Sequence, residues 1–202
     1  MARYTGPKHK MCRRVGEPLC GSPKCPALKR SYPPGQHGPN LRQRKLSEYG
    51  VRLQEKQKAR YIYGLLERQF RRYFQRAARA RGKTGEMLLR LLETRLDSLV
   101  YRMQLARSMR QARQLVTHGH FTVNGRKVNI PSYQVRPGDV IAVREKSRNL
   151  QVIRENAETA NPNLPYIEVD PERLEGKLLR WPERDEIPVN IDETLIVEFY
   201  SR

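Results

Sequence analysis

The segment from Ala106 to Val143 constrains the fold most, because it contains several local structural signals in a row. Ser108 and Gln111 match the S-x-x-Q capping box that begins a helix, and Gly119 can end that helix in the left-handed conformation. Asn124–Gly125 then predicts a two-residue hairpin turn. A helix followed by antiparallel strands predicts a small α+β module, and therefore an α+β protein.

Alternating apolar residues extend this module beyond its helix. The stretches HFTV, RKV and VIAV are typical of short strands, and the turn at Pro137–Asp139 precedes the last of them. One face of the helix should be buried, and the other should meet solvent. The buried stripe is Met109, Ala112, Leu115 and Val116, and the solvent face is Arg107, Arg110, Arg113 and Gln114.

The region before this module has the period of helices. Residues 47–64 predict a helix that Gly64 ends, and residues 67–81 predict a second helix. After the break at GKTG, where Thr84 is a candidate N-cap, the apolar period continues to Met103, in one helix or across a kink. The buried stripe of the second helix is Phe70, Tyr73, Phe74 and Ala77.

Charge is distributed unevenly along the chain. The formal net charge is +19, to which residues 1–90 contribute +18, residues 91–160 contribute +6 and residues 161–202 contribute −5. A protein this basic needs a polyanionic partner, so nucleic acid is the first partner to expect. The acidic C-terminal segment should face something else, such as a protein.

The N-terminal arm, residues 1–46, is rich in Gly, Pro and basic residues and cannot bury enough apolar surface to order itself. Its first ten residues lack the apolar stretch of a signal peptide, and no apolar run in the chain approaches the ~20 residues that cross a membrane. We therefore expect a cytoplasmic protein without membrane association. Its thiols should stay reduced and bind metal rather than form disulfides.

All three cysteines lie in this arm, near one histidine. The order His9-x2-Cys12-x7-Cys20-x4-Cys25 has the spacing of a closed, tetrahedral structural site. Zinc suits three thiolates and one imidazole, whereas an iron–sulfur cluster more commonly takes thiolates alone. The alternative is three reduced cysteines in a flexible arm. A bound ion would hold Arg13 and Arg14, inside the loop, at fixed positions for phosphate contact.

Seven motifs, in order along the chain, resemble the family of bacterial small-subunit ribosomal protein S4. They are MARYTGP, YPPGQHG, VRLQEKQKARYIYG, ERQFRRYF, LLETRLDSLVYRM, RQARQLVTHGHFTVNGRKV and LIVEFYSR. Residues 106–143 by themselves resemble the S4 RNA-binding domain, a module found in ribosomal, rRNA-modifying and synthetase proteins. The match is weakest over residues 148–190.

The resemblance implies a fold of three parts. These are a metal-binding basic N-terminal arm over residues 1–46, an all-helical domain over 47–94 plus 181–202, and a small α+β S4 RNA-binding domain with a basic hairpin over 95–180. The C-terminal segment is expected to return to the helical domain as a strand.

The resemblance also implies a function without catalysis. The family is a structural constituent of the small ribosomal subunit that binds rRNA early, nucleates assembly of the subunit body and contributes to translational accuracy. The implied partners are the small-subunit rRNA, the neighbouring ribosomal protein five, functionally protein twelve, and mRNA near its entry path. No homo-oligomer is expected.

A junction of A-form RNA helices is recognised by shape, phosphates and 2′-hydroxyls, because its major groove is too deep and narrow for side chains to read. We therefore expect cations on several surfaces to contact rRNA. The candidates are Arg13, Arg14 and His37 in the arm; Lys56, Lys58, Arg60, Arg68, Arg71 and Arg72 on the helices; and Arg107, Arg110, Arg113, His118, His120, Asn124, Arg126 and Lys127 in the S4 module.

Two other protein classes fit the sequence less well. An rRNA-modifying enzyme that uses an S4 domain as its RNA handle would need a catalytic domain, for which residues 150–202 are too few. A zinc-finger transcription factor would need the cysteine spacing of a ββα finger and a recognition helix directly after Cys25, and the sequence has neither.

Overall fold

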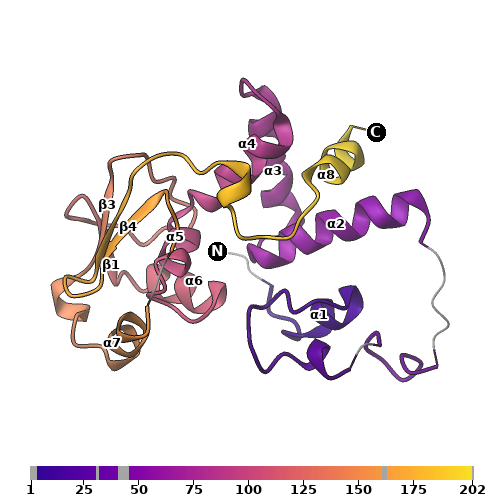
Figure 1. The fold of residues 1–202 in the computed structure, drawn as a ribbon, viewed down its shortest axis with the longest axis horizontal. Helices are drawn as coiled ribbons and strands as arrows, with labels where there is room; N and C mark the ends of the chain where they lie inside the picture. Colours follow the sequence, from indigo (N-terminus) through magenta and orange to yellow (C-terminus); the bar gives the residue numbers. More distant parts are fainter. Residues whose placement is uncertain (1–3, 31, 41–45, 161–162, 202) are drawn as a thin grey trace. The chain divides into compact units, whose positions relative to one another are not determined.

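The structure is a computed structural model (Figure 1). It describes residues 4–30, 32–40, 46–160 and 163–201. Within these ranges the chain forms α-helices and one antiparallel sheet, which confirms the predicted α+β class. The first three residues of the motif MARYTGP and the last residue of LIVEFYSR lie outside the described ranges.

The chain divides into two compact units. The first consists of residues 1–85 and 189–202, and the second of residues 86–188. The division into three parts that begin at residues 1, 47 and 95 stays a prediction. No helix of the described ranges combines the length and the apolar character that crossing a membrane requires.

The first unit is helical. Its elements are α1 (Lys10–Val15), the short 3-10 helix η1 (Pro26–Leu28), α2 (Glu48–Ile62), α3 (Glu67–Arg79) and α8 (Glu193–Tyr200). The two helices predicted over residues 47–64 and 67–81 are therefore confirmed. Ser47 caps α2 by accepting a hydrogen bond from the backbone N–H of Gly50, and Gly64 follows the helix with a φ of +62°.

The C-terminal segment forms the helix α8, so the prediction that it returns as a strand is wrong. The side chain of Asp192 accepts a hydrogen bond from the backbone N–H of Thr194 and thereby caps the first turn. At the other end, the ring of Tyr200 lies 4.6 Å from that of Phe74 and 6.3 Å from that of Phe70, both on α3. The cap and these aromatic contacts stabilise a helix where the apolar run alone is ambiguous.

The second unit combines helices with a five-stranded sheet of order β2-β1-β3-β5-β4, in which neighbouring strands are antiparallel. Most of α4 (Thr84–Glu93) belongs to this unit. Its other elements are α5 (Leu96–Arg102), α6 (Met109–Thr117), β1 (Phe121–Val123), β2 (Arg126–Lys127), β3 (Val140–Val143), η2 (Glu145–Ser147), α7 (Gln151–Glu158), β4 (Ile167–Asp170), β5 (Glu175–Leu178) and η3 (Arg184–Glu186).

The helix start, helix end and hairpin turn predicted within residues 106–143 are all present, but the capping box is incomplete. The Ser108 side chain caps α6, and Gly119 follows the helix with a φ of +74°. Asn124 and Gly125 have φ values of +50° and +77°, as a type I′ hairpin turn requires. The Gln111 side chain, however, accepts from the backbone N–H of Arg107 rather than from that of Ser108, so the capping box is not reciprocal.

The apolar period from Met87 to Met103 is broken into α4 and α5 rather than forming one helix. The side chain of Gln134 donates to the backbone oxygen of Leu91 (3.1 Å) and to the hydroxyl of Thr94 (2.8 Å). Arg95 forms a β-bridge with Gln134 directly after this point. These contacts satisfy the backbone where the helical ladder stops.

The core of the second unit lies between the helices α5, α6 and α7 and one face of the sheet. Leu99, Val116, Phe121, Ile141 and Ile153 are all buried there. The strands β4 and β5 and the helix α7 were not predicted, since residues 148–180 carry no clear period. They complete the sheet and cover the core, which holds the α6–hairpin segment in place.

Candidate metal centre and nucleic-acid interface

The short helix α1 places two of the candidate metal ligands on one face. The backbone N–H of Arg13 donates to the oxygen of His9 (3.0 Å), so His9 and Cys12 are one turn apart. Gly16, with a φ of +83°, ends the helix, and its N–H donates to the oxygen of Cys12 (2.8 Å). The chain then turns back, so that Cys25, just before η1, approaches α1.

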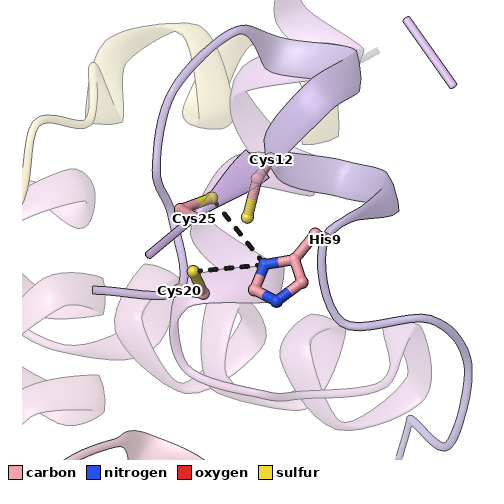
Figure 2. Close-up of side chains that lie close together, drawn as sticks. All are labelled: His9, Cys12, Cys20 and Cys25. Atoms are coloured by element: carbon pink, nitrogen blue, oxygen red, sulfur yellow. Dashed lines mark hydrogen bonds between the residues drawn. The ribbon is translucent and has the colours of Figure 1, made fainter. Parts of the chain in front are cut away.

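The four side chains His9, Cys12, Cys20 and Cys25 point toward one another (Figure 2). Their candidate ligand atoms all lie within 4.8 Å of each other. The Nδ1 atom of His9 lies 3.5 Å from the Sγ atom of Cys20 and 3.7 Å from that of Cys25. A tetrahedral zinc ion with Zn–S of about 2.3 Å and Zn–N of about 2.0 Å would separate nitrogen and sulfur by about 3.5 Å. The cluster could therefore hold a metal ion.

The surroundings of Cys12 oppose a bare thiolate. Burial, and after it the charge of Cys20, raise the pKa of the Cys12 thiol to about 12. A metal ligand must be the thiolate, and a bound cation supplies the charge that stabilises it. Cys12 and Cys25 are buried, whereas His9 and Cys20 are half-buried.

The arm that carries the cluster is anchored on α2. The buried ammonium group of Lys58 lies 3.0 Å from a carboxylate oxygen of Glu17 in the arm and 3.7 Å from one of Glu55. Tyr61 packs against the small apolar cluster that contains Cys12. These contacts fix the position of the arm on the helix.

Burial changes the roles expected for the cations of α2. Lys56 and Lys58 are only 4% and 5% exposed. Lys56 lies 2.8 Å from a carboxylate oxygen of Glu67, and Arg60 lies 3.5 Å from the same atom. A phosphate contact requires exposure that the two lysines do not have, so we leave both out of the proposed RNA interface.

The exposed face of α3 agrees better with the prediction. Arg68, Arg71 and Arg72 are all exposed. Together with Glu67 and Gln75 they line an open groove of about 540 Å³. Three guanidinium groups beside a groove can meet a phosphate backbone without a large rearrangement.

The α6–hairpin region presents several of the predicted cations. Arg107, Arg110, His118, Arg126 and Lys127 are exposed. Arg107 also donates from Nε to the side-chain oxygen of Asn156 (2.9 Å) on α7 and from Nη2 to Glu155 (3.2 Å).

Arg113 does not face solvent as expected. Its side chain is 12% exposed and lies 4.0 Å from a carboxylate oxygen of Asp97. Asp97 is itself buried and also accepts two hydrogen bonds from Arg95, at 2.9 and 2.5 Å. Charged residues in the motif LLETRLDSLVYRM were not singled out from the sequence, because nothing in a local pattern indicates that an ion pair will be buried.

Two further candidates make hydrogen bonds inside the module. The side chain of Asn124 donates to Asp139 (2.8 Å) and accepts from the backbone N–H of Val140 (2.9 Å), which joins the hairpin turn to the start of β3. The Nδ1 atom of His120 lies 2.9 Å from the hydroxyl of Ser147. Burial lowers the pKa of His120, and the nearby charges of His118 and Arg144 lower it too, so its ring is neutral at pH 7.

The candidates in the arm have different environments. Arg14 and His37 are exposed. Arg13 is half-buried and donates from Nη2 to the backbone oxygen of Pro33 (3.1 Å).

Two family models match adjoining parts of the chain. The model described as Ribosomal protein S4/S9 N-terminal domain matches residues 3–93, and the S4 domain model matches residues 94–141. The chain belongs to the ribosomal protein S4 family. The resemblance read from the seven motifs is thereby confirmed.

Relatives named small ribosomal subunit protein uS4 are similar over their entire lengths. The protein from Geobacillus stearothermophilus is 62% identical over 202 residues, and the match covers 100% of both chains. The protein from Thermus thermophilus is 54% identical over 210 residues, again covering 100% of both chains. Because this family consists of structural ribosomal proteins, the chain is not an enzyme, and the rRNA-modifying alternative has no support.

Proposed function

We propose that this chain is a structural constituent of the small ribosomal subunit and acts in the cytoplasm as part of the ribosome. The observation that carries the proposal is the 62% identity, over the full length of both chains, with a small ribosomal subunit protein uS4. The net charge of +19 supports it, since a free protein of this charge would repel itself, whereas rRNA neutralises it.

The proposed rRNA interface consists of exposed cations on both units. In this proposal the protein binds rRNA early and holds several RNA helices together, which nucleates assembly of the subunit body. Shape and phosphate contacts suffice for that task, because an A-form junction offers few accessible base edges. The proposed contacts are Arg14, His37, Arg68, Arg71, Arg72, Arg107, Arg110, His118, Arg126 and Lys127.

The acidic C-terminal part of the chain is proposed to meet protein rather than RNA. Residues 161–202 carry a net charge of −5, which disfavours a phosphate surface. We assign to this side a contact with the neighbouring ribosomal protein five. Through it, and functionally with protein twelve, the chain would contribute to translational accuracy near the mRNA entry path.

The metal proposed for the Cys/His cluster is a structural zinc ion. His9, Cys12, Cys20 and Cys25 would complete a tetrahedral shell, which leaves no position for a reacting water. Zinc is favoured over an iron–sulfur cluster because one donor is the imidazole nitrogen of His9. The ion would contribute its binding energy to folding of the arm.

Binding to purified small-subunit rRNA at several salt concentrations tests the proposed function. Log K should fall with log salt by about 0.7–0.9 for every phosphate contact. Arg126→Ala should weaken binding and reduce that slope by about one such increment, since Arg126 is exposed at the hairpin. A random-sequence DNA duplex should bind more weakly than the rRNA.

Arg173→Ala is the matched control. Arg173 is also exposed, with 74% of its side chain accessible, but it lies 3.5 Å from Asp170 and 3.8 Å from Glu175. This variant should leave the slope unchanged. Equal affinity for rRNA and random DNA, or the same slope in Arg126→Ala and wild type, would contradict the proposal.

A further inference from the structure

Arg13 joins two segments of the arm that are far apart in sequence. It follows the candidate ligand Cys12 on α1, and its Nη2 atom donates to the backbone oxygen of Pro33 (3.1 Å). Its guanidinium group also lies over the ring of Tyr32, with the Cζ atom 4.8 Å from the ring centroid. Both contacts reach the segment 32–40, which contains the motif YPPGQHG.

This segment forms two successive turns, and we call it the 32–40 loop. The backbone N–H of Gly38 donates to the oxygen of Gly35 (3.1 Å), and that of Asn40 donates to the oxygen of His37 (3.2 Å). A Cβ atom on Gly38 would lie 2.0 Å from the oxygen of Pro33, so only glycine allows this approach. The oxygen that accepts from Arg13 is therefore held against the loop itself.

The 32–40 loop presents uncharged polar groups to solvent. Gln36 and His37 are exposed at its tip. Residues 32–40 include no lysine, arginine, aspartate or glutamate. The loop therefore offers no carboxylate, ammonium or guanidinium group to a partner.

We propose that Arg13 is a positioning residue that holds the 32–40 loop in the orientation in which Gln36 and His37 meet rRNA, and that it makes no phosphate contact itself. The inference rests on the proposed function. The inference gives Arg13 a different role from its neighbour Arg14, whose exposed side chain is available to a phosphate.

The backbone of Arg13 is joined to two of the candidate metal ligands. The backbone N–H of Arg13 donates to the oxygen of His9, and the residue before it is Cys12. A helix of six residues is too short to persist alone, so a bound ion would help the contacts with α2 to keep α1 folded. Loss of the ion should therefore release the 32–40 loop as well.

Salt dependence of rRNA binding distinguishes the two arginines. Measured near pH 8, where a histidine is neutral, Arg13→Ala should weaken binding about tenfold through the lost hydrogen bond and cation–π contact. Its slope of log K against log salt should equal that of the wild type. Arg14→Ala should reduce the slope by about 0.7–0.9, the loss of one phosphate contact. Equal loss of slope in the two variants would overturn the inference.

A double-mutant cycle with His37→Ala tests whether Arg13 acts through the loop. If it does, the affinity losses of Arg13→Ala and His37→Ala are not additive, because either change removes the same loop contact. Arg14→Ala and His37→Ala should be additive within about twofold, because in this proposal the two side chains make independent contacts. Additivity in both cycles would overturn the inference.

Amide hydrogen exchange of the free protein provides a readout that does not require RNA. Arg13→Ala should speed exchange at Gly38 and Asn40 while the bound metal remains at the wild-type level, and Arg14→Ala should not. Treating the wild type with a chelator should speed exchange at the same two amides. Unchanged exchange in Arg13→Ala would overturn the inference even if rRNA binding and metal content follow the proposed function. If the wild type contains no metal, the proposed site and its role in holding the loop are wrong, and the exchange of Arg13→Ala still decides the role of Arg13.

Discussion

At the scale of single residues, the carboxylate of Glu67 contacts three polar side chains of the first unit. Glu67 lies at the start of α3 and accepts hydrogen bonds from the ammonium group of Lys56 (2.8 Å) and the hydroxyl of Tyr200 (2.6 Å). The guanidinium group of Arg60 lies 3.5 Å away. Burial opposes ionisation of Glu67, but the hydrogen bonds from Lys56 and Tyr200, with the charges of Lys56 and Arg60, outweigh burial and lower its pKa below the ordinary value.

This pKa predicts an acid-sensitive stability. A carboxylate with a lower pKa in the folded state stabilises fully above its unfolded pKa, about 4.3, and loses that contribution as the pH falls through the folded value. Glu67→Gln should therefore reduce the drop in melting temperature measured between about pH 6 and pH 3. Glu172→Gln, which changes an exposed carboxylate on the β4–β5 turn, should keep the wild-type drop. Identical curves for all three proteins would contradict the role of Glu67.

A second prediction at this scale concerns the zinc content of the Cys/His cluster. Elemental analysis after metal-replete expression should find close to one zinc ion per chain in the wild type and a much lower content in Cys20→Ser, because three ligands bind zinc less tightly than four. Ser22→Ala, in the same loop, should retain the wild-type content. The site would be disproved by less than about a tenth of an equivalent of any transition metal in the wild type.

At the scale of elements, the caps hold short helices that propensity alone would not stabilise. The helix α6 has only nine residues, and its N-cap Ser108 accepts a hydrogen bond from the N–H of Gln111 (3.2 Å). This helix carries Arg110 and precedes the basic hairpin, so its stability bears on the proposed RNA interface.

Removing this cap should destabilise α6 locally. Ser108→Ala should lower the opening free energy of the α6 amides by about 0.5–2 kcal/mol, as measured by native-state hydrogen exchange. Ser201→Ala is the control, since Ser201 follows α8 and its hydroxyl donates to the backbone oxygen of Val197 (2.8 Å) instead of capping a helix start. It should change the opening free energy of α8 by less than about 0.5 kcal/mol. If Ser108→Ala changed the opening free energy of α6 no more than Ser201→Ala changes that of α8, the stabilising role of the Ser108 cap would be contradicted.

At the scale of the whole molecule, the two units should differ in their dependence on the metal. The core of the second unit is built from residues between Leu96 and Leu178, and all four candidate ligands belong to the first unit. Chelation should therefore release residues 9–30 to fast amide exchange, while residues 86–188 keep their protection. Simultaneous loss of protection in both ranges would show that the metal stabilises more than the arm.

The α6–hairpin part of the second unit and the membership of the Cys/His cluster could be predicted from the sequence. Ser108, Gly119 and Asn124–Gly125 signal a helix start, a helix end and a hairpin, because each acts on backbone groups within a few residues. The clustering of these four side chains was predictable for a similar reason, since His9, Cys12, Cys20 and Cys25 lie within one short arm and only a turn is needed to bring them together.

Only the tertiary structure determined which cations are available and what the C-terminal segment becomes. Lys58 is buried by a partner 41 positions away, Glu17, and Arg52 pairs with Glu198 across 146 positions. Local periodicity cannot indicate such pairs, because it reports the neighbours of a residue along one helix and not the segment that later covers it. The same limit explains α8, whose apolar run becomes a helix because Asp192 caps it and Tyr200 packs on α3.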